Sequence, residues 1–439
     1  MAARVVQRVL GEDAFVSDAL DAELGQREAR LDARDRALAT ELCYGVIRIE
    51  PVLSERLERL AKRGLGKGDE LLRSHLLVAA YQLLVLDRVP AFAAINEAVS
   101  ALTRLRGPRV AGFANAVLRK LSTSGERLTL GAALEASVAP WLMSELERSV
   151  GREPALGLLG ASPGGARRGL SIRLTPRADR SQLPWLTRAE PGQLVSSALW
   201  LPPSGDLRKL EGYDEGAFVV QEEGAQWAAL ALGAREGERV LDACAGHGQK
   251  SSLIAERLGA EGRLWVNDVA ENKLARLRRE FQRLGLPEPA CSVVDLTRGV
   301  GDLPSGMDRV IVDAPCTGTG TLRRRPEILR RLTPDDPARL AERAAELLRQ
   351  AASLARPGGR VLFVVCSVLR TECEDVAERL RGVLEPAPFD VPDAARVAGE
   401  GAWQCRLLPS VHGTDGYYVA SFVRGGGELA KTALSSTDG

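Results

Sequence analysis

The sequence predicts a multidomain protein in which an all-α region precedes an α/β region. Up to about residue 125, apolar side chains recur only at helical spacing. From about residue 236, short runs rich in Val, Ile and Leu alternate with charged helical segments. Such a series is typical of a mostly parallel sheet with helices on both faces. Residues 160–165, rich in glycine, with serine and proline, indicate a loop or linker between the two regions.

The helical pattern is clearest in two stretches of the first region, which Pro90 and other breaks divide into separate helices. The apolar positions that carry this pattern are Leu72, Leu76, Leu77, Ala80, Leu83 and Leu84 in one stretch, and Val110, Phe113, Val117 and Leu121 in the other.

Five strands are expected in the second region, and ligands of such a sheet gather beyond the carboxyl ends of its strands. Two later runs are joined by a short turn with Gly413, Asp415 and Gly416, which predicts an antiparallel hairpin at the end of the sheet. We expect the tail beyond residue 425 to be disordered. The predicted strands are residues 239–244, 263–268, 291–296, 308–313 and 360–365, and the hairpin strands are 405–408 and 417–423.

Composition limits the class of protein. The 439 residues are 45% hydrophobic, enough for two or three domains with cores of their own. The net charge is only +1, so a nucleic-acid partner has to be held by local patches. The seven cysteines are scattered without a disulfide-like or zinc-like spacing. No apolar run approaches the roughly 20 residues that span a bilayer. We expect a cytoplasmic protein with no metal and no membrane segment.

A glycine-containing loop follows the first predicted strand, running from Asp242 to Lys250 into a helix over 251–258. Glycine lets a ligand approach the backbone, but dinucleotide enzymes and adenosyl-cofactor enzymes share such loops, and many turns simply need glycine. Asp268 ends the second strand, where a carboxylate can accept both hydroxyls of a ribose. Asp295 ends the third, where it can meet an adenine amino group. Either aspartate alone is equally compatible with a helix N-cap.

Two cysteines lie at the ends of later strands, Cys316 after Asp313-Ala314-Pro315 and Cys366 before Ser367. Carbon 5 of cytosine accepts a methyl group only after a nucleophile has added to carbon 6, and a thiolate does this well. A second polar group can then assist release of the product. The spacing does not decide which cysteine attacks. A single buried cysteine usually packs as a small hydrophobe, which is what we expect of Cys244, Cys291 and Cys405.

The order of these motifs resembles the RsmB/Sun family of RNA cytosine carbon-5 methyltransferases, and the resemblance extends over nearly the whole chain. Segments 36–46, 81–84, 96–99 and 113–119 resemble the helical domain of that family, which is similar to the antitermination factor NusB. The resemblance implies a NusB-like RNA-binding bundle over 1–128, a linker and substrate-recognition segment over 129–235, a Rossmann-like methyltransferase domain over 236–425 and a tail over 426–439.

The resemblance also implies roles for individual residues. Cys366 is the nucleophile and Cys316 assists release, while Asp313 lies near the methionine moiety of S-adenosyl-L-methionine and the target base. Asp268 is expected on the ribose and Asp295 near the adenine. Apart from the resemblance, attack requires a thiolate, and both Lys250 and the arginines after Cys316 are candidates for lowering the pKa of Cys366. The loop residues that line the cofactor are expected to be Cys244, Ala245, Gly246, His247, Gly248, Gln249 and Lys250.

One position departs from the family pattern. The family usually has Ala-Pro-Gly-Gly-Lys where this chain has Gly246-His247-Gly248-Gln249-Lys250. If the replaced glycine needs a positive φ or a close cofactor approach, Gln249 costs about 1 kcal/mol or crowds the cofactor. We therefore expect altered cofactor affinity rather than an inactive site.

Two arginine clusters are expected to bind RNA phosphates. The first, Arg323, Arg324 and Arg325 followed by Arg330 and Arg331, is opposed only by Glu327; a solvated helix face is the alternative. The second comprises Arg167, Arg168, Arg173, Arg177 and Arg180. By resemblance, the partner is small-subunit rRNA. We expect a monomer, although the sequence does not decide the oligomeric state.

Two other functions remain open at this stage. A nicotinamide dehydrogenase would use the same glycine loop and Asp268, but it leaves the cysteine pair unexplained and has Ser251 where a third glycine is wanted. A catalytically silent RNA-binding assembly factor would account for Gln249.

Overall fold

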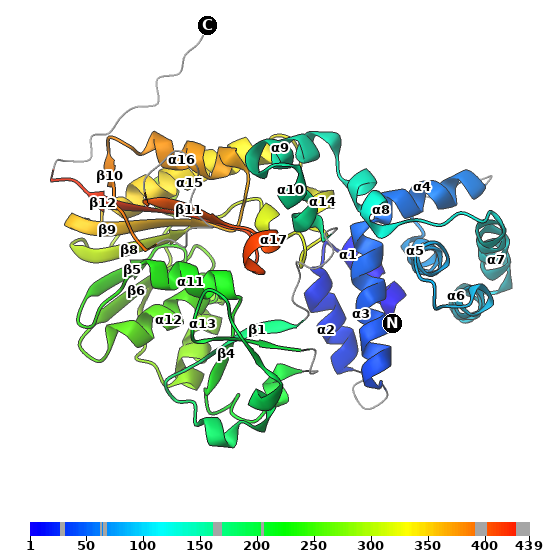
Figure 1. The fold of residues 1–439 in the computed structure, drawn as a ribbon, viewed down its shortest axis with the longest axis horizontal. Helices are drawn as coiled ribbons and strands as arrows, with labels where there is room; N and C mark the ends of the chain where they lie inside the picture. Colours follow the sequence, from blue (N-terminus) through cyan, green and yellow to red (C-terminus); the bar gives the residue numbers. More distant parts are fainter. Residues whose placement is uncertain are drawn as a thin grey trace, which may run out of the picture. The chain divides into compact units, whose positions relative to one another are not determined.

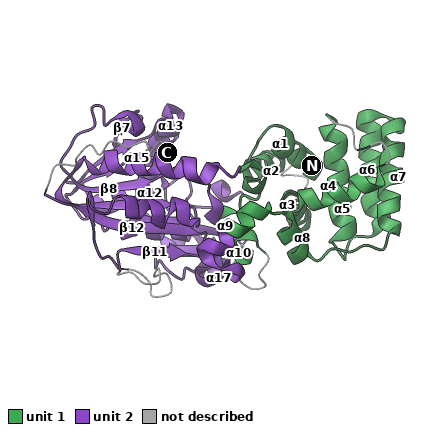
Figure 2. Cartoon of the chain, turned by 90° about the horizontal axis from the view of Figure 1, so that it is seen from above, with its two compact units in different colours: residues 1–144, 155–162, 321–332 green, residues 145–154, 163–320, 333–439 purple. Residues whose placement is uncertain are grey.

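The computed structural model describes residues 1–26, 31–61, 64, 68–160, 169–202, 206–390 and 402–426. The chain forms two compact units, coloured separately in Figure 2. Unit 1 comprises residues 1–144, 155–162 and 321–332, and unit 2 comprises 145–154, 163–320 and 333–439. The predicted loop over 160–165, beyond Gly160, lies outside the described residues, as do Arg167, Arg168 and the predicted disordered tail from 427 onward. Among the described helices, none has the length and apolarity needed to cross a bilayer.

Unit 1 is helical, as its sequence pattern predicts. Its core gathers the apolar positions of the helices, including Leu76, Leu77, Leu84, Val117 and Leu121, all nearly inaccessible to solvent. Its complete helices are α1 (Ala2–Gly11), α2 (Val16–Gly25), α3 (Ala33–Arg48), α4 (Glu50–Leu60), α5 (Glu70–Leu84), α6 (Ala91–Arg106), α7 (Pro108–Thr123), α8 (Leu130–Ser137) and α14 (Ile328–Arg331). Helices α9 (Pro140–Val150) and α10 (Arg152–Leu159) each have residues in both units.

Residues 321–332 belong to the C-terminal half of the chain, yet they pack within unit 1. The Arg48 guanidinium donates to the Arg323 carbonyl (2.7 Å), and Arg330 forms an ion pair with Glu50, whose side chain is 2% exposed. Arg73 also pairs with Glu50, at 2.6 Å. These contacts make α14 an integral part of the helical unit (Figure 1).

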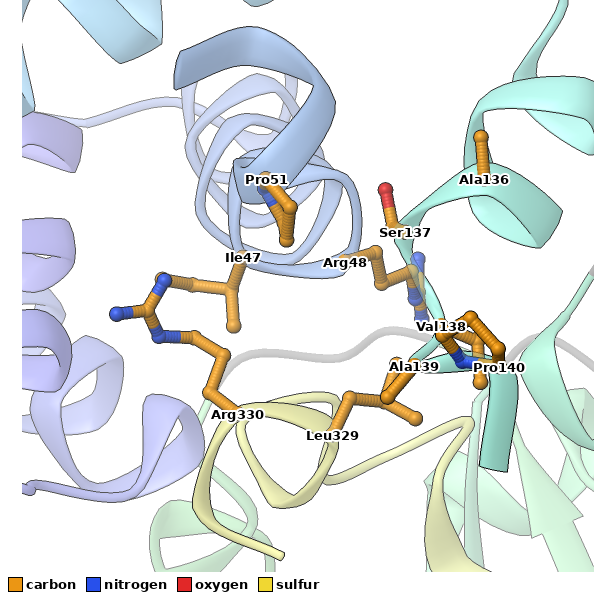
Figure 3. A pocket seen from close by; sticks show the side chains of 10 residues that line it. All are labelled: Ile47, Arg48, Pro51, Ala136, Ser137, Val138, Ala139, Pro140, Leu329 and Arg330. Carbon is orange, nitrogen blue, oxygen red and sulfur yellow. The ribbon is translucent and has the colours of Figure 1, made fainter. Parts of the chain in front are cut away.

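A cavity of about 350 Å³ lies within unit 1, where the start of α4, the α8–α9 connection and α14 come together (Figure 3). Arg48 and Arg330 contribute to its wall, and the remaining lining is mostly apolar. Because α14 forms one side of this cavity, the far segment 321–332 also shapes the surface of the helical unit.

The middle of the chain forms a small antiparallel sheet in unit 2, with strand order β2-β3-β1-β4. Trp185 and Phe218 pack edge to face in its core, with ring centroids 5.0 Å apart. The strands are β1 (Leu170–Leu174), β2 (Glu190–Pro191), β3 (Ala198–Leu201) and β4 (Phe218–Val220), followed by α11 (Glu223–Ala231).

The larger sheet of unit 2 has the order β10-β12-β9-β8-β5-β6-β7, with β11 paired to β12. Strands β7, β6, β5, β8 and β9 run parallel, and β12 pairs antiparallel with β9, so the mixed Rossmann-like fold is confirmed. The strands are β5 (Arg239–Asp242), β6 (Arg263–Asn267), β7 (Ala290–Ser292), β8 (Met307–Asp313), β9 (Ala355–Val365), β10 (Leu384–Pro386), β11 (Gln404–Leu407) and β12 (Tyr417–Arg424).

Helices cover both faces of this sheet (Figure 1). Leu241 and Val310 turn to a core shared with α15, whereas their neighbours Val240 and Ile311 turn to a core shared with α11 and α12. This alternation follows from the two-residue period of a strand. The helices are α12 (Gln249–Leu258), α13 (Glu271–Leu284), α15 (Asp336–Ala352), α16 (Glu374–Arg379) and α17 (Pro409–His412).

Two predicted elements differ from the structure. The third strand was expected to reach residue 296, but β7 ends at Ser292, and Asp295 instead caps a short 3₁₀ turn, Leu296–Arg298. The predicted antiparallel hairpin is present, yet its connection contains α17 rather than a short turn alone. Pro409 at the first position of α17 favours that helical turn.

Candidate active site

The loop between β5 and α12 is shaped by two glycines with positive φ. Gly246 has φ 56° and Gly248, which caps α12, has φ 81°. A Cβ on Gly246 would enter open space, whereas one on Gly248 would lie 2.5 Å from Leu277 Cγ of α13. The loop therefore stays tight against α13 at Gly248 and open at Gly246.

Gln249 does not occupy a position that needs glycine. Gln249 is the first residue of α12. Its φ is not positive, because Asp13 is the one non-glycine residue with positive φ among the residues that the structure describes. The side-chain amide of Gln249 donates to the Val220 carbonyl (3.1 Å). The expected backbone strain is therefore absent, because the left-handed positions are Gly246 and Gly248. His247 is exposed in the same loop.

Asp268 holds this loop from the end of β6. Its carboxylate accepts hydrogen bonds from the backbone N–H groups of Gly246 (3.0 Å) and Ala270 (2.9 Å). Asp295 behaves differently: hydrogen bonds from the hydroxyl and backbone N–H of Thr297 lower the pKa of Asp295 and fix its side chain as a cap. Asp268 thus binds the backbone of the glycine loop. The contact of Asp295 with adenine stays a prediction.

Lys250 and Asp313 form an ion pair beside the cysteines. The Lys250 ammonium lies 2.6 Å from an Asp313 carboxylate oxygen, and the lysine side chain is only 11% exposed. Burial on its own lowers the pKa of Lys250, but the Asp313 carboxylate, with help from Cys366, raises it overall. The ammonium also lies 5.6 Å from the centre of the Tyr417 ring. Lys250 is therefore a fixed positive charge at this end of the sheet.

The two predicted catalytic cysteines meet. Cys316 Sγ and Cys366 Sγ are 3.4 Å apart, although 50 residues separate them in sequence. The parallel pairing of β8 with β9, which sets Asp313 opposite Val364, brings their loops together. The hydrogen bond with Cys366 and burial raise the pKa of Cys316 well above its usual value. The two sulfurs therefore lie together at the ends of β8 and β9, and their separate catalytic roles stay a prediction.

The predicted RNA contact of Arg173 is contradicted by its burial. Its side chain is fully buried and pairs with Glu256 of α12, while its guanidinium also donates to Gln221 and Ser252. A guanidinium with these partners is not available to a phosphate. Arg173 instead joins β1 of the small sheet to α12.

The three arginines predicted to bind RNA after Cys316 belong to unit 1. Arg324 and Arg325 are exposed and Arg323 is half-buried. Arg325 lies over the Phe15 ring, 5.3 Å from its centre, as Arg331 does at 5.1 Å. Their role in binding RNA remains a prediction.

Comparison with known proteins agrees with this geometry. Residues 229–423 match the family of the 16S rRNA methyltransferase RsmB/F, and residues 1–123 match the NusB family. The ribosomal RNA small subunit methyltransferase B of Xylella fastidiosa is 34% identical over 97% of this chain and 99% of its own. The chain belongs to the RsmB/F family of rRNA methyltransferases. A probable member from Bacillus subtilis is 30% identical over 90% of this chain and 92% of its own.

Solved structures support the fold. The crystal structure of PH0851 superimposes with a TM-score of 0.82 at 22% identity, covering 96% of this chain and 98% of that one. The crystal structure of NSun6 from Pyrococcus horikoshii with SFG, an S-adenosylmethionine analogue, has a TM-score of 0.58 at 16% identity, covering 65% and 98%.

The cofactor of this RsmB/F family member is S-adenosyl-L-methionine. The site residues fit it: open space at Gly246 leaves the loop backbone accessible, and polar groups lie on both sides of it, Asp268 after β6 and the Lys250–Asp313 pair at the end of β8, the two strands that flank β5. With the family established, the nicotinamide dehydrogenase is excluded.

Sequence reasoning missed the buried Asp242 and Glu372. Asp242 accepts a hydrogen bond from Ser251 (2.6 Å), and burial raises the pKa of Asp242 to about 6. Glu372, 1% exposed, accepts hydrogen bonds from Thr317 and Ser367, the residues that follow the two cysteines. Asp242 stands at the end of a predicted strand and could have been noticed, whereas no local pattern marks Glu372.

Proposed function

We propose that this protein forms 5-methylcytosine in small-subunit rRNA through a covalent adduct between Cys366 and carbon 6 of the target cytosine. The observation that carries the proposal is the 3.4 Å approach of Cys316 Sγ to Cys366 Sγ next to the Lys250 ammonium. One sulfur can attack while the other keeps its proton, which is the division of labour that this chemistry needs.

The first step uses the Cys366 thiolate. Its addition to carbon 6 breaks the 5,6 double bond and makes carbon 5 electron-rich. The positive charge of Lys250 favours the thiolate, since cations nearby lower the pKa of a cysteine. Bound S-adenosyl-L-methionine supplies the electrophilic methyl group. Asp313 stays paired with Lys250 at 2.6 Å and thereby orients the ammonium.

Release requires loss of the carbon 5 proton and cleavage of the bond between carbon 6 and Cys366 Sγ, which restores the double bond. Cys316 Sγ lies 3.4 Å from Cys366 Sγ, which places it to assist this elimination. Cys316 gives its own proton to solvent and, as a thiolate, accepts the carbon 5 proton while Cys366 leaves as a thiolate.

Contact with the rest of the RNA is assigned to Arg323, Arg324 and Arg325. Arg324 and Arg325 are exposed, and phosphates are the natural partners of clustered guanidinium groups. The target base has to leave its stack to reach the cysteines. The silent assembly factor receives no support from Gln249, because that residue is helical and its side-chain amide binds the Val220 carbonyl.

The test is a denaturing gel of Cys316→Ala incubated with S-adenosyl-L-methionine and unmodified small-subunit rRNA. We expect a protein–RNA adduct that persists because release is slowed. The double variant Cys316→Ala/Cys366→Ala should give no adduct. No adduct from Cys316→Ala, with RNA and cofactor binding intact, would refute the proposed mechanism.

A further inference from the structure

A buried carboxylate, Glu372, connects the loops that carry the two cysteines. Thr317 follows Cys316 in sequence and donates its backbone N–H to Glu372 (2.7 Å), and its hydroxyl donates to the same carboxylate. Ser367 follows Cys366, and its hydroxyl donates to Glu372 at 2.6 Å. One side chain therefore receives hydrogen bonds from both cysteine loops.

These hydrogen bonds are buried and mutually consistent. Glu372 is 1% exposed and Ser367 is 0% exposed. All three bonds are donated to the Glu372 carboxylate, which accepts each of them. Burial raises the pKa of Glu372, and the hydrogen bonds from Ser367 and Thr317 act against that rise. Thr319 extends the network, since its hydroxyl lies 2.9 Å from the Ser367 hydroxyl and accepts the Val368 N–H. Removing the acceptor from such a network leaves buried donors unsatisfied.

The sheet brings the two cysteine loops together but does not reach the cysteines themselves. The registered pairs of β8 and β9 end at Asp313 and Val364, before either cysteine is reached. Beyond that point a backbone bond from Gly320 N–H to the Cys366 carbonyl (2.9 Å) crosses between the loops. The two sulfurs themselves lie 3.4 Å apart. Further described side-chain hydrogen bonds between the loops involve Glu372 and the hydroxyls of Thr317, Thr319 and Ser367. The separation of the two sulfurs thus depends on groups that do no chemistry themselves.

We propose that Glu372 is a positioning residue that holds the Cys316 and Cys366 loops at the separation needed for attack and release. This inference rests on the proposed function of the two cysteines. A misplacement of about 1 Å in a reacting group can reduce a rate by about 10²-fold. The negative charge of Glu372 also contributes to raising the pKa of Cys316, after the hydrogen bond with Cys366 and burial.

The experiment compares Glu372→Gln with Glu374→Gln in the full-length protein. Glu374 is a matched control because it is a nearly buried carboxylate two residues away that pairs with Arg406 instead of the cysteine loops. Each variant is assayed for thermal unfolding, for kcat and KM with unmodified small-subunit rRNA, and for cofactor affinity.

We expect Glu372→Gln to lower kcat at least about tenfold, with KM for S-adenosyl-L-methionine within about threefold of wild type. Glu374→Gln should keep kcat within about threefold. A kcat of Glu372→Gln within that same range would refute the positioning role, as would an equal loss in both variants. If Glu372→Gln does not fold, Thr317→Val and Ser367→Ala each remove one hydroxyl donor, and an unchanged kcat in both would overturn the inference.

Adduct formation separates this inference from the proposed function. With Glu372 intact, absence of an adduct from Cys316→Ala would refute the proposed function and the positioning role with it. An adduct that forms equally fast in Cys316→Ala and in Cys316→Ala/Glu372→Gln would refute the positioning role alone. We expect at least about tenfold slower formation in the double variant.

Discussion

Gly246 and Gly248 share a left-handed backbone but have different surroundings. A non-glycine residue pays about 1 kcal/mol for that conformation at either position. At Gly248 the added Cβ would also lie 2.5 Å from Leu277 Cγ, and Leu277 is fully buried. Overpacking of this kind costs about 1–3 kcal/mol. Gly248→Ala should therefore destabilise the protein by about 2–4 kcal/mol, and Gly246→Ala by about 1 kcal/mol.

Thermal unfolding and isothermal titration with S-adenosyl-L-methionine test this pair. For a domain of this size 1 kcal/mol corresponds to about 2–4 °C in Tm, so Gly248→Ala should have a Tm lower than Gly246→Ala by at least about 2 °C. The added methyl group of Gly246→Ala points into open space at the cofactor loop, so we expect that variant to lose cofactor affinity while staying nearly as stable as wild type. Equal Tm values, or greater destabilisation by Gly246→Ala, would refute the reasoning.

Three further substitutions address buried ionisable groups of unit 2. Arg173→Met leaves Glu256 buried without its cation and should lower the free energy of unfolding by about 3–5 kcal/mol in denaturant titrations. If this variant has wild-type stability but binds RNA more weakly, Arg173 contacts RNA after all. Burial stabilises the neutral form of Asp242. The contribution of Asp242 to the free energy of unfolding is therefore complete below its unfolded pKa of 3.8 and is lost as the pH rises through about 6. Its pKa shift corresponds to about 3 kcal/mol in full, of which about 2 kcal/mol is lost between pH 4 and pH 7. Asp242→Asn should change the stability difference between these two pH values by about 2 kcal/mol, and an unchanged difference contradicts the assignment. Lys250→Met should slow alkylation of Cys366 by iodoacetamide at neutral pH about tenfold, as followed by peptide mass mapping, and an unchanged rate would exclude Lys250 as the group that favours the thiolate.

The sequence predicted those features that depend on local pattern. Helical spacing identified the helices of unit 1, and short Val, Ile and Leu runs identified the strands that carry Asp268, Asp313 and Cys366 at their ends. Because parallel strands end at one edge of a sheet, two cysteines at predicted strand ends were expected at the same edge, and the chemistry of cytosine methylation together with the family resemblance placed Cys316 and Cys366 in one site. The same argument placed Asp295 at a strand end, but β7 ends earlier, at Ser292.

Features that depend on tertiary contacts were not predictable in this way. An arginine in a basic stretch looks like a surface residue, and only the packing of β1 on α12 reveals that Arg173 has a buried carboxylate partner. Gln249 seemed strained by comparison with the family pattern, yet the positive φ angles belong to its neighbours. Glu372 lies in a charged stretch whose sequence resembles an ordinary helix face, and its burial depends on Thr317, 55 residues away.

The packing of residues 321–332 into the helical unit bears on how the nascent chain folds during synthesis. The ribosome delivers α1 to α8 long before α14, so Glu50 is made without its Arg330 partner and Phe15 without Arg325 and Arg331. The N-terminal bundle can complete its packing only after the chain has been translated through residue 332, which lies within the methyltransferase match over residues 229–423. A fragment that stops at residue 144 omits this segment, and a faithful isolated bundle would require residues 321–332 to be supplied as a separate peptide or grafted through a new linker.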